Sequence, residues 1–174
     1  MKEARRLVLT LLLVLCLPAA LAGCGESSGD GAGVQADMEA LQQAMVAADP
    51  SLPDLRSLTS ADPGAEDNFP YLSDFPYEKV AGFLLSFSTT GTADEIAVIQ
   101  VKDPADAAEA RESLERHRQE RLKLFQTYGP TEAARVEKGQ VIKDGLYALL
   151  IICDDVDGVK DAFDSYLLGL SKEG

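Results

Sequence analysis

Apolar residues recur at intervals of three and four in three segments of the chain, which predicts three amphipathic helices. The middle segment carries the clearest boundary signals. Asp103-Pro104 is a typical helix start, with Asp as the cap and Pro in the first turn, and Gly129-Pro130 ends the segment. A short helical turn over residues 131–137 follows. The predicted helices cover residues 34–48, residues 103–128, and a C-terminal segment that includes Val159, Phe163, Tyr166, Leu167 and Leu170.

Four other apolar runs are short and bounded by turn residues, which predicts strands. They pair into two hairpins, one around Gly91 and one around Asp144-Gly145, because such turns join neighbouring antiparallel strands. The run from Leu146 to Cys153 is the most hydrophobic of the chain beyond residue 23 and predicts a central strand. The four predicted strands are residues 80–88, 95–102, 140–143 and 146–153.

The segment of residues 50–76 is rich in Pro, Asp and Ser and has no long periodicity, so we expect an extended connection. Phe69-Pro70-Tyr71 is nearly repeated as Phe75-Pro76-Tyr77. These aromatic residues either form a platform for a ligand or fasten the long loop to the core.

Together these elements predict an α+β fold in the order α-β-β-α-β-β-α, within a single domain of residues 34–174. Two hairpins separated by a long helix favour a two-layer arrangement: a four-stranded, mostly antiparallel sheet with helices on one face.

The first 23 residues have the pattern of a bacterial lipoprotein signal peptide. A positively charged start precedes an apolar run from Leu7 to Leu17, which Pro18 ends and which is short for a membrane span. The tetrad Leu21-Ala22-Gly23-Cys24 resembles a lipobox, in which the cysteine thiol receives diacylglycerol before cleavage between Gly23 and Cys24. Residues 24–33 are rich in Gly and Ser, which predicts a flexible tether behind the lipidated cysteine. We therefore expect a lipid anchor on the extracytoplasmic face of the cell membrane.

The net charge of the chain limits the classes of molecule that it can bind. The formal net charge is −13, and removal of residues 1–23 leaves 13 basic and 28 acidic side chains, a net charge of −15. Phosphates would repel so acidic a chain, so nucleic acid is excluded as a partner class. The same repulsion leaves membrane attachment to the lipid.

Signatures of catalysis, metal binding and cofactor binding are missing from the sequence. His117, the sole histidine, lies among charged residues in the middle of the long helix, which predicts exposure to solvent. Cys153 ends a hydrophobic strand and precedes two aspartates, which predicts an inert, partly buried thiol. The acidic cluster Asp154, Asp155 and Asp157 lacks the spacing of an EF-hand, and aspartates before a helix are typical helix caps. We therefore predict no metal site and no cofactor.

Arg118 and Arg121 are the candidate binding residues. At about 100° per residue they fall within about 40° of Leu114, on the apolar face of the long helix. An arginine on an inward face needs a partner. One interpretation is that these side chains snorkel to solvent or form a salt bridge to Glu95 or another acid at the edge of the sheet. The other is a pocket between helix and sheet that receives a carboxylate or another anion.

Three stretches resemble a known family: Tyr77 to Val80, Ala93 to Asp103, and Tyr128-Gly-Pro130 leading into residues 141–150. Following a lipobox, they are similar to a family of small uncharacterised lipoproteins, a domain of unknown function found mainly in low-GC Gram-positive bacteria. The resemblance covers residues 70 to 170. It implies a location at the outer face of the cell membrane, and no activity or site residues.

These observations favour a non-catalytic binding module for a partner protein or a small solute. An enzyme that uses carboxylates such as Asp94 and Glu95 is an alternative, although adjacent strand residues point to opposite faces. A structural accessory subunit of a membrane complex is a third interpretation.

Overall fold

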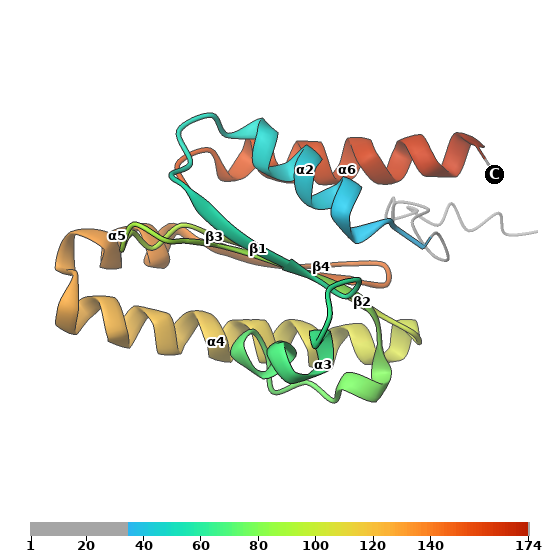
Figure 1. Ribbon diagram of the computed structural model, residues 1–174, viewed down its shortest axis with the longest axis horizontal. Helices are drawn as coiled ribbons and strands as arrows, with labels where there is room; N and C mark the ends of the chain where they lie inside the picture. The colour runs from blue at the N-terminus through green and yellow to red at the C-terminus, as the bar shows by residue number, and fades with distance from the viewer. Residues whose placement is uncertain (1–34, 174) are drawn as a thin grey trace, which may run out of the picture.

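A five-stranded antiparallel sheet forms the middle layer of the protein (Figure 1). The computed structural model describes residues 35–173. The strand order is β1-β2-β3-β5-β4, so β3 lies at the centre and β1 and β4 lie at the edges. The strands are β1 (Leu55–Thr59), β2 (Val80–Ser88), β3 (Glu95–Val101), β4 (Gln140–Asp144) and β5 (Tyr147–Ile152).

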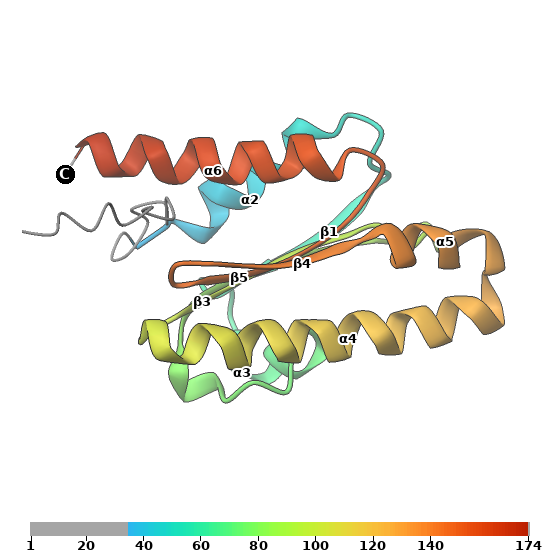
Figure 2. The ribbon, with the colours of Figure 1, turned by 180° about the vertical axis from the view of Figure 1, so that it is seen from behind.

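Helices cover both faces of this sheet, as the two opposite views show (Figures 1 and 2). On one face α2 (Met38–Ala48) lies beside α6 (Val156–Glu173). On the other face the long α4 (Ala107–Tyr128) lies beside α3 (Ala65–Asn68) and the 3-10 turn η1 (Phe69–Tyr71), and α5 (Pro130–Lys138) leads from α4 into β4. Two further 3-10 turns, η2 (Tyr77–Lys79) and η3 (Pro104–Asp106), precede β2 and α4. Within the described residues, no helix is both long and apolar enough to span a bilayer.

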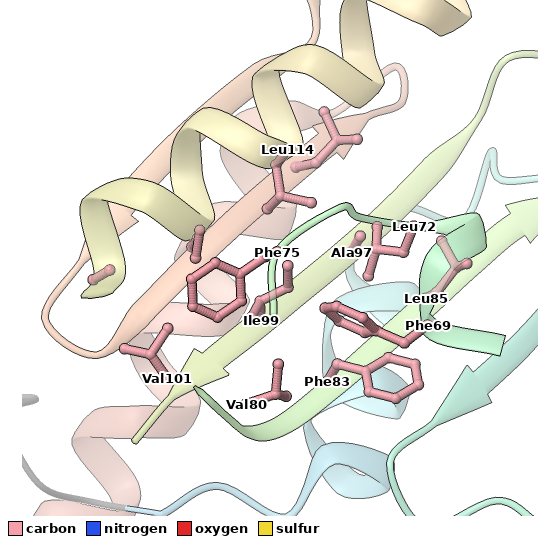
Figure 3. Packing of buried hydrophobic residues seen from close by; sticks show 14 of the residues in the cluster. Phe69, Leu72, Phe75, Val80, Phe83, Leu85, Ala97, Ile99, Val101 and Leu114 are labelled. Atoms are coloured by element: carbon pink, nitrogen blue, oxygen red, sulfur yellow. The ribbon is translucent and has the colours of Figure 1, made fainter. Parts of the chain in front are cut away.

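Side-chain alternation along the central strands produces two separate cores. All residues of β3 and β5 are buried, because one set of alternate side chains faces α4 and the other faces α2 and α6. The core on the α4 side is shown in Figure 3 and includes Phe69, Leu72, Phe83, Ile99 and Leu114. The core on the opposite side includes Leu41, Met45, Val98, Leu149 and Phe163.

Local signals in the sequence account for the helix boundaries. Asp37 accepts hydrogen bonds from the backbone N–H groups of Glu39 and Ala40 and so caps α2. Asp103 accepts from the N–H of Ala105 at the start of η3, as the Asp-Pro signal predicts. Asp155 accepts from the N–H of Gly158 at the start of α6, 2.9 Å away, so this aspartate is a helix cap.

Most predicted elements are confirmed, and two features of the predicted architecture are wrong. The sheet has five strands instead of four, because β1 lies within the segment of residues 50–76 that we expected to be extended connection. The fold has three layers instead of two, because helices pack on both faces of the sheet. The observed order is α2-β1-α3-β2-β3-α4-α5-β4-β5-α6, with the short 3-10 turns between them.

Candidate functional site

A pocket of about 370 Å³ opens between α4 and the part of the sheet formed by β1, β2 and β3. Its volume lies in the range of small-molecule sites. Strand residues form the floor, and residues from α3, η1 and α4 form the walls. The lining residues are Arg56, Leu58, Asn68, Tyr71, Leu85, Phe87, Glu95, His117 and Arg121.

The pairing register of the sheet places the floor residues. Arg56 is paired with Phe87, and Phe87 is paired with Glu95, so these three lie side by side on neighbouring strands. Leu58 and Leu85 form the next row on the same face. The floor is therefore apolar in its middle, with a cation at one side and a carboxylate at the other.

Glu95 is the buried charge of the pocket, with only 2% of its side chain exposed. A carboxylate in such a place must be paired and hydrogen-bonded. Its Oε1 lies 2.7 Å from His117 Nε2, and its Oε2 lies 2.8 Å from Arg121 Nε. Because a carboxylate only accepts, Nε2 of His117 carries the proton when Glu95 is ionised.

Arg121 is fixed by three kinds of contact. Its Nε is ion-paired with Glu95 Oε2, without the alignment of a hydrogen bond. Its Nη2 donates to the carbonyl oxygen of Ala93 at 3.1 Å. The guanidinium carbon lies 5.4 Å from the centre of the Phe125 ring, a cation–π contact. Of the salt bridge and the anion pocket proposed for this residue, the salt bridge to Glu95 is observed, and the same arginine also lines a pocket.

Arg118, the second candidate, points elsewhere. Its guanidinium pairs with Glu115 one turn earlier in α4, at 2.7 Å, and donates to the carbonyl oxygen of Val136 in α5. The side-chain hydrogen bond with Arg118 is the main cause that lowers the pKa of Glu115. Arg118 therefore joins α4 to α5 and is not among the residues that line the pocket.

His117 and Arg56 are site residues that sequence reasoning missed. His117 is partly buried against Glu95, so the prediction of a solvent-exposed histidine is wrong. The available signal was Glu95, the one charged residue of a mostly apolar strand, because a buried carboxylate needs donors on the element that covers it. Arg56 lies on the strand that was not predicted, so the sequence offered no reason to place it beside a pocket.

The wall formed by α3 and η1 is fastened to α4. The hydroxyl groups of Ser73 and Ser113 lie 2.5 Å apart and are buried. Asp74 accepts hydrogen bonds from Arg116 and Ser113, which lower the pKa of its carboxyl group. These groups also line a smaller pocket of about 130 Å³, which shares Tyr71 and His117 with the larger one.

The two Phe-Pro-Tyr segments mainly fasten the long connection before β2 to the core on the α4 side. Phe69 and Phe75 are buried in the core on the α4 side, and the ring of Phe69 lies 5.3 Å from that of Tyr77. Tyr71 is the exception, because 73% of it is exposed and it lines both pockets. One aromatic ring of the four therefore faces a candidate ligand site.

Asp94 and Glu95 lie in separate ion-pair clusters. The Asp94 carboxylate is buried and pairs with Arg135 of α5, which also contacts Glu132 and Asp154. Burial opposes the charge of Arg135, but the hydrogen bond and the charge of Asp94 outweigh it and raise the pKa of Arg135. Only Glu95 lines the pocket, so the two carboxylates do not share a cleft.

The remaining candidate residues from the sequence, Cys153 and the nearby aspartates, take part in packing and helix capping. Cys153 is buried, and burial together with the nearby charge of Asp49 raises the pKa of its thiol to about 12. Asp49 also accepts from the backbone N–H of Asp155, which ties the end of α2 to the start of α6. In residues 35–173 no three or more His, Cys, Asp or Glu residues are grouped to hold a metal ion. Gly23 and Cys24, the proposed cleavage and lipidation site, lie outside the described residues, as do the signal peptide of residues 1–23 and the tether of residues 24–33.

The fold and the pocket together define the class: a small α+β domain with a mixed polar and apolar pocket between a long helix and an antiparallel sheet. Residues 57–153 match the model of a family described as a domain of unknown function, DUF4358, so the chain belongs to the DUF4358 family. The match starts earlier and ends sooner than residues 70–170, the range of the sequence resemblance. It includes every lining residue except Arg56, which precedes it by one position. No curated protein and no solved structure matches the chain.

Proposed function

We propose that this protein is a membrane-tethered, non-catalytic binding module that holds a small solute in the pocket between α4 and the sheet. The observation that carries the proposal is a pocket of ligand size whose buried carboxylate is ion-paired with Arg121 and contacts the imidazole of His117. Such a site can desolvate a ligand without leaving a buried charge unpaired. Phe87, Leu85 and Leu58 supply the apolar contact area.

The tether is the second part of the proposal. The positive start, the short apolar run and the tetrad ending at Cys24 support a lipoprotein. On this proposal diacylglycerol on Cys24 holds the acidic domain at the extracytoplasmic face of the cell membrane. The intact mass of the protein extracted from its own membrane tests this attachment.

A small solute is favoured over a protein partner by the distribution of exposed apolar side chains. In the described part of the chain the large exposed ones are spread over η1, α4 and α6, and only Leu124 and Tyr128 are neighbours, one helical turn apart. A protein interface normally presents a contiguous apolar patch. The pocket therefore supports the proposal better than the outer surface supports a docking site.

The contact between His117 and Glu95 favours an enzyme as the second candidate. A carboxylate that orients a histidine is the arrangement of a general base in many hydrolases. Of the lining residues only Tyr71 carries a hydroxyl group, so an attacking water molecule would be required. NMR spectra of the protein mixed with candidate compounds separate the two functions. A binding module leaves a bound compound unchanged, whereas an enzyme converts it and loses that activity on His117→Gln.

The proposal is tested by amide NMR spectra of the chain from residue 25 onward, which contains every described residue, mixed with a chemically diverse fragment collection. We expect binding compounds to shift resonances of the lining residues. Leu58→Trp, which fills the pocket, should abolish those shifts, whereas Leu168→Trp, on the exposed side of α6, should leave them intact. Shifts that survive Leu58→Trp, or a collection that shifts no lining residue, would contradict the proposed binding site.

A further inference from the structure

Arg56 and Arg121 approach the pocket from opposite sides. Arg56 lies on the edge strand β1, in register with Phe87 of β2. Arg121 descends from α4 onto Glu95, which is in register with the same Phe87 on β3. Both arginines line the pocket, so the apolar surface of Phe87 lies between two cations.

The pocket has more positive charge than its own acid can compensate. Glu95 is the one carboxylate among the lining residues, and Arg121 is paired with it. Arg56 makes no ion pair or hydrogen bond with any residue in the described range, in contrast to Arg116 and Arg135, which have acid partners. The pocket is therefore locally cationic in a protein with a net charge of −13.

Donor groups of Arg121 also stay available. The guanidinium has five N–H bonds, and its contacts within residues 35–173 use Nε and Nη2. Nη1 has no hydrogen-bond partner within that range. An arginine held in place by a buried carboxylate and an aromatic ring is a preorganised donor, because it loses little conformational freedom when a ligand binds.

We propose that the solute is a small organic monoanion whose carboxylate lies between Arg56 and Arg121 and whose apolar body lies against Phe87, Leu85 and Tyr71. This inference rests on the proposed binding function and specifies its ligand class. A carboxylate matches the planar donor geometry of arginine. The apolar floor disfavours a strongly hydrated dianion such as phosphate, and the two arginines disfavour a cation.

The test uses three probes of similar shape and different charge: phenylacetate, phenylacetamide and phenethylamine. Each is titrated into the chain from residue 25 onward and followed by amide NMR spectra. We expect phenylacetate to bind about tenfold more tightly than phenylacetamide, because it alone brings a negative charge to the two arginines. Phenethylamine should bind most weakly.

Arg56→Gln is the decisive variant, because the side chain of Arg56 makes no ion pair or hydrogen bond within residues 35–173, so its loss should disturb the fold little. It should weaken phenylacetate binding by about tenfold and phenylacetamide binding much less, because only the carboxylate loses a charge–charge attraction. Arg111→Gln, an arginine of α4 outside the pocket, is the matched control and should change neither.

Equal affinities for the carboxylate and the amide, or an equal loss of both on Arg56→Gln, would overturn the anionic ligand class and leave the binding module standing. The tightest binding by phenethylamine would overturn it as well. If none of the three probes shifts a lining residue, this ligand class is wrong. The proposed function is then decided by the broader fragment collection, which includes neutral and cationic compounds of other shapes.

Discussion

Glu95 is the one charged side chain among the seven residues of β3, and its position explains much of the pocket. Burying a carboxylate costs several kcal/mol unless charged donors compensate it. α4 supplies two donors from adjacent turns, the imidazole of His117 and the charged guanidinium of Arg121, since side chains four residues apart share a helix face. The wall of the pocket is thus determined by the requirement to neutralise one strand residue.

This requirement gives a stability prediction for the pair of Glu95 and Arg121. Glu95→Gln should destabilise the fold by about 3 kcal/mol, because it leaves a partly buried guanidinium without its counter-charge. In a double-mutant cycle with Arg121→Gln, the coupling free energy should be about 1–3 kcal/mol. Chemical denaturation of the two single variants and the double variant measures it.

The control cycle uses Glu115 and Arg118, a pair on the same helix with a more exposed carboxylate. Its coupling free energy should stay below about 1 kcal/mol. If the two cycles give the same value, burial does not strengthen the pocket ion pair, and our description of the site is wrong.

For individual residues, the sequence predicted one contact of the site and could not predict the others. The helical position of Arg121 on an apolar face pointed to an acid on the sheet, and Glu95 is that acid. His117 shares that face, but its charged neighbours along the chain concealed it, because neighbours in sequence point to different sides of a helix. The position of Arg56 beside Phe87 depends on the pairing register of β1 and β2, which no local pattern of residues encodes.

Among the elements, those with strong periodicity or clear turn signals appear close to their predicted bounds. β2 and β5 and the long α4 are examples. β1 was missed because it is short, lies at the edge of the sheet and carries Arg56 and Ser57 on exposed positions, which gives it little of the apolar character of an inner strand. Edge strands of this type are typical of natural sheets and weakly marked in sequence.

Two glycines give a matched test of how tightly the elements pack. At Gly139, between α5 and β4, an added Cβ would lie 2.7 Å from Cγ1 of Ile152 and 3.1 Å from two backbone oxygens. Gly139→Ala should therefore destabilise the fold by about 1–3 kcal/mol through overpacking. Gly169 of α6 has open space around it, so Gly169→Ala should stabilise the fold by about 0.5–1 kcal/mol through helix propensity.

Thermal unfolding of both variants measures these changes with opposite expected signs. A neutral Gly139→Ala would show that the junction of α5, β4 and β5 is loose, and α5 would then be a poor support for the neighbouring ion-pair cluster of Asp94 and Arg135.

For the whole molecule, the layer arrangement was the main error of the sequence analysis. The continuous hydrophobic run of β5 predicts a strand in the interior of the sheet, and β5 lies there, between β3 and β4. A strand that is apolar on both of its faces must be covered on both. The helices α2 and α6, which lie far apart in the sequence, supply this second helical layer by packing side by side (Figure 2).

The two faces of the sheet differ in how completely the helices cover them. The side with α2 and α6 is closed by an apolar core from Met38 to Leu167. The side with α4 holds the pocket, because α3, η1 and α4 do not fill the surface of β1 and β2 completely.

The central claim is that the pocket holds a small solute, in a protein that we propose is anchored to a membrane by lipid on Cys24. Native mass spectrometry of the full-length protein purified from its own cells tests it most directly, with the wild type and Leu58→Trp compared. We expect lipid mass on Cys24 in both, and a noncovalently bound small organic anion in the wild type alone. Identical small-molecule content in the two proteins would contradict the binding site, and an unmodified thiol at Cys24 would contradict the anchor.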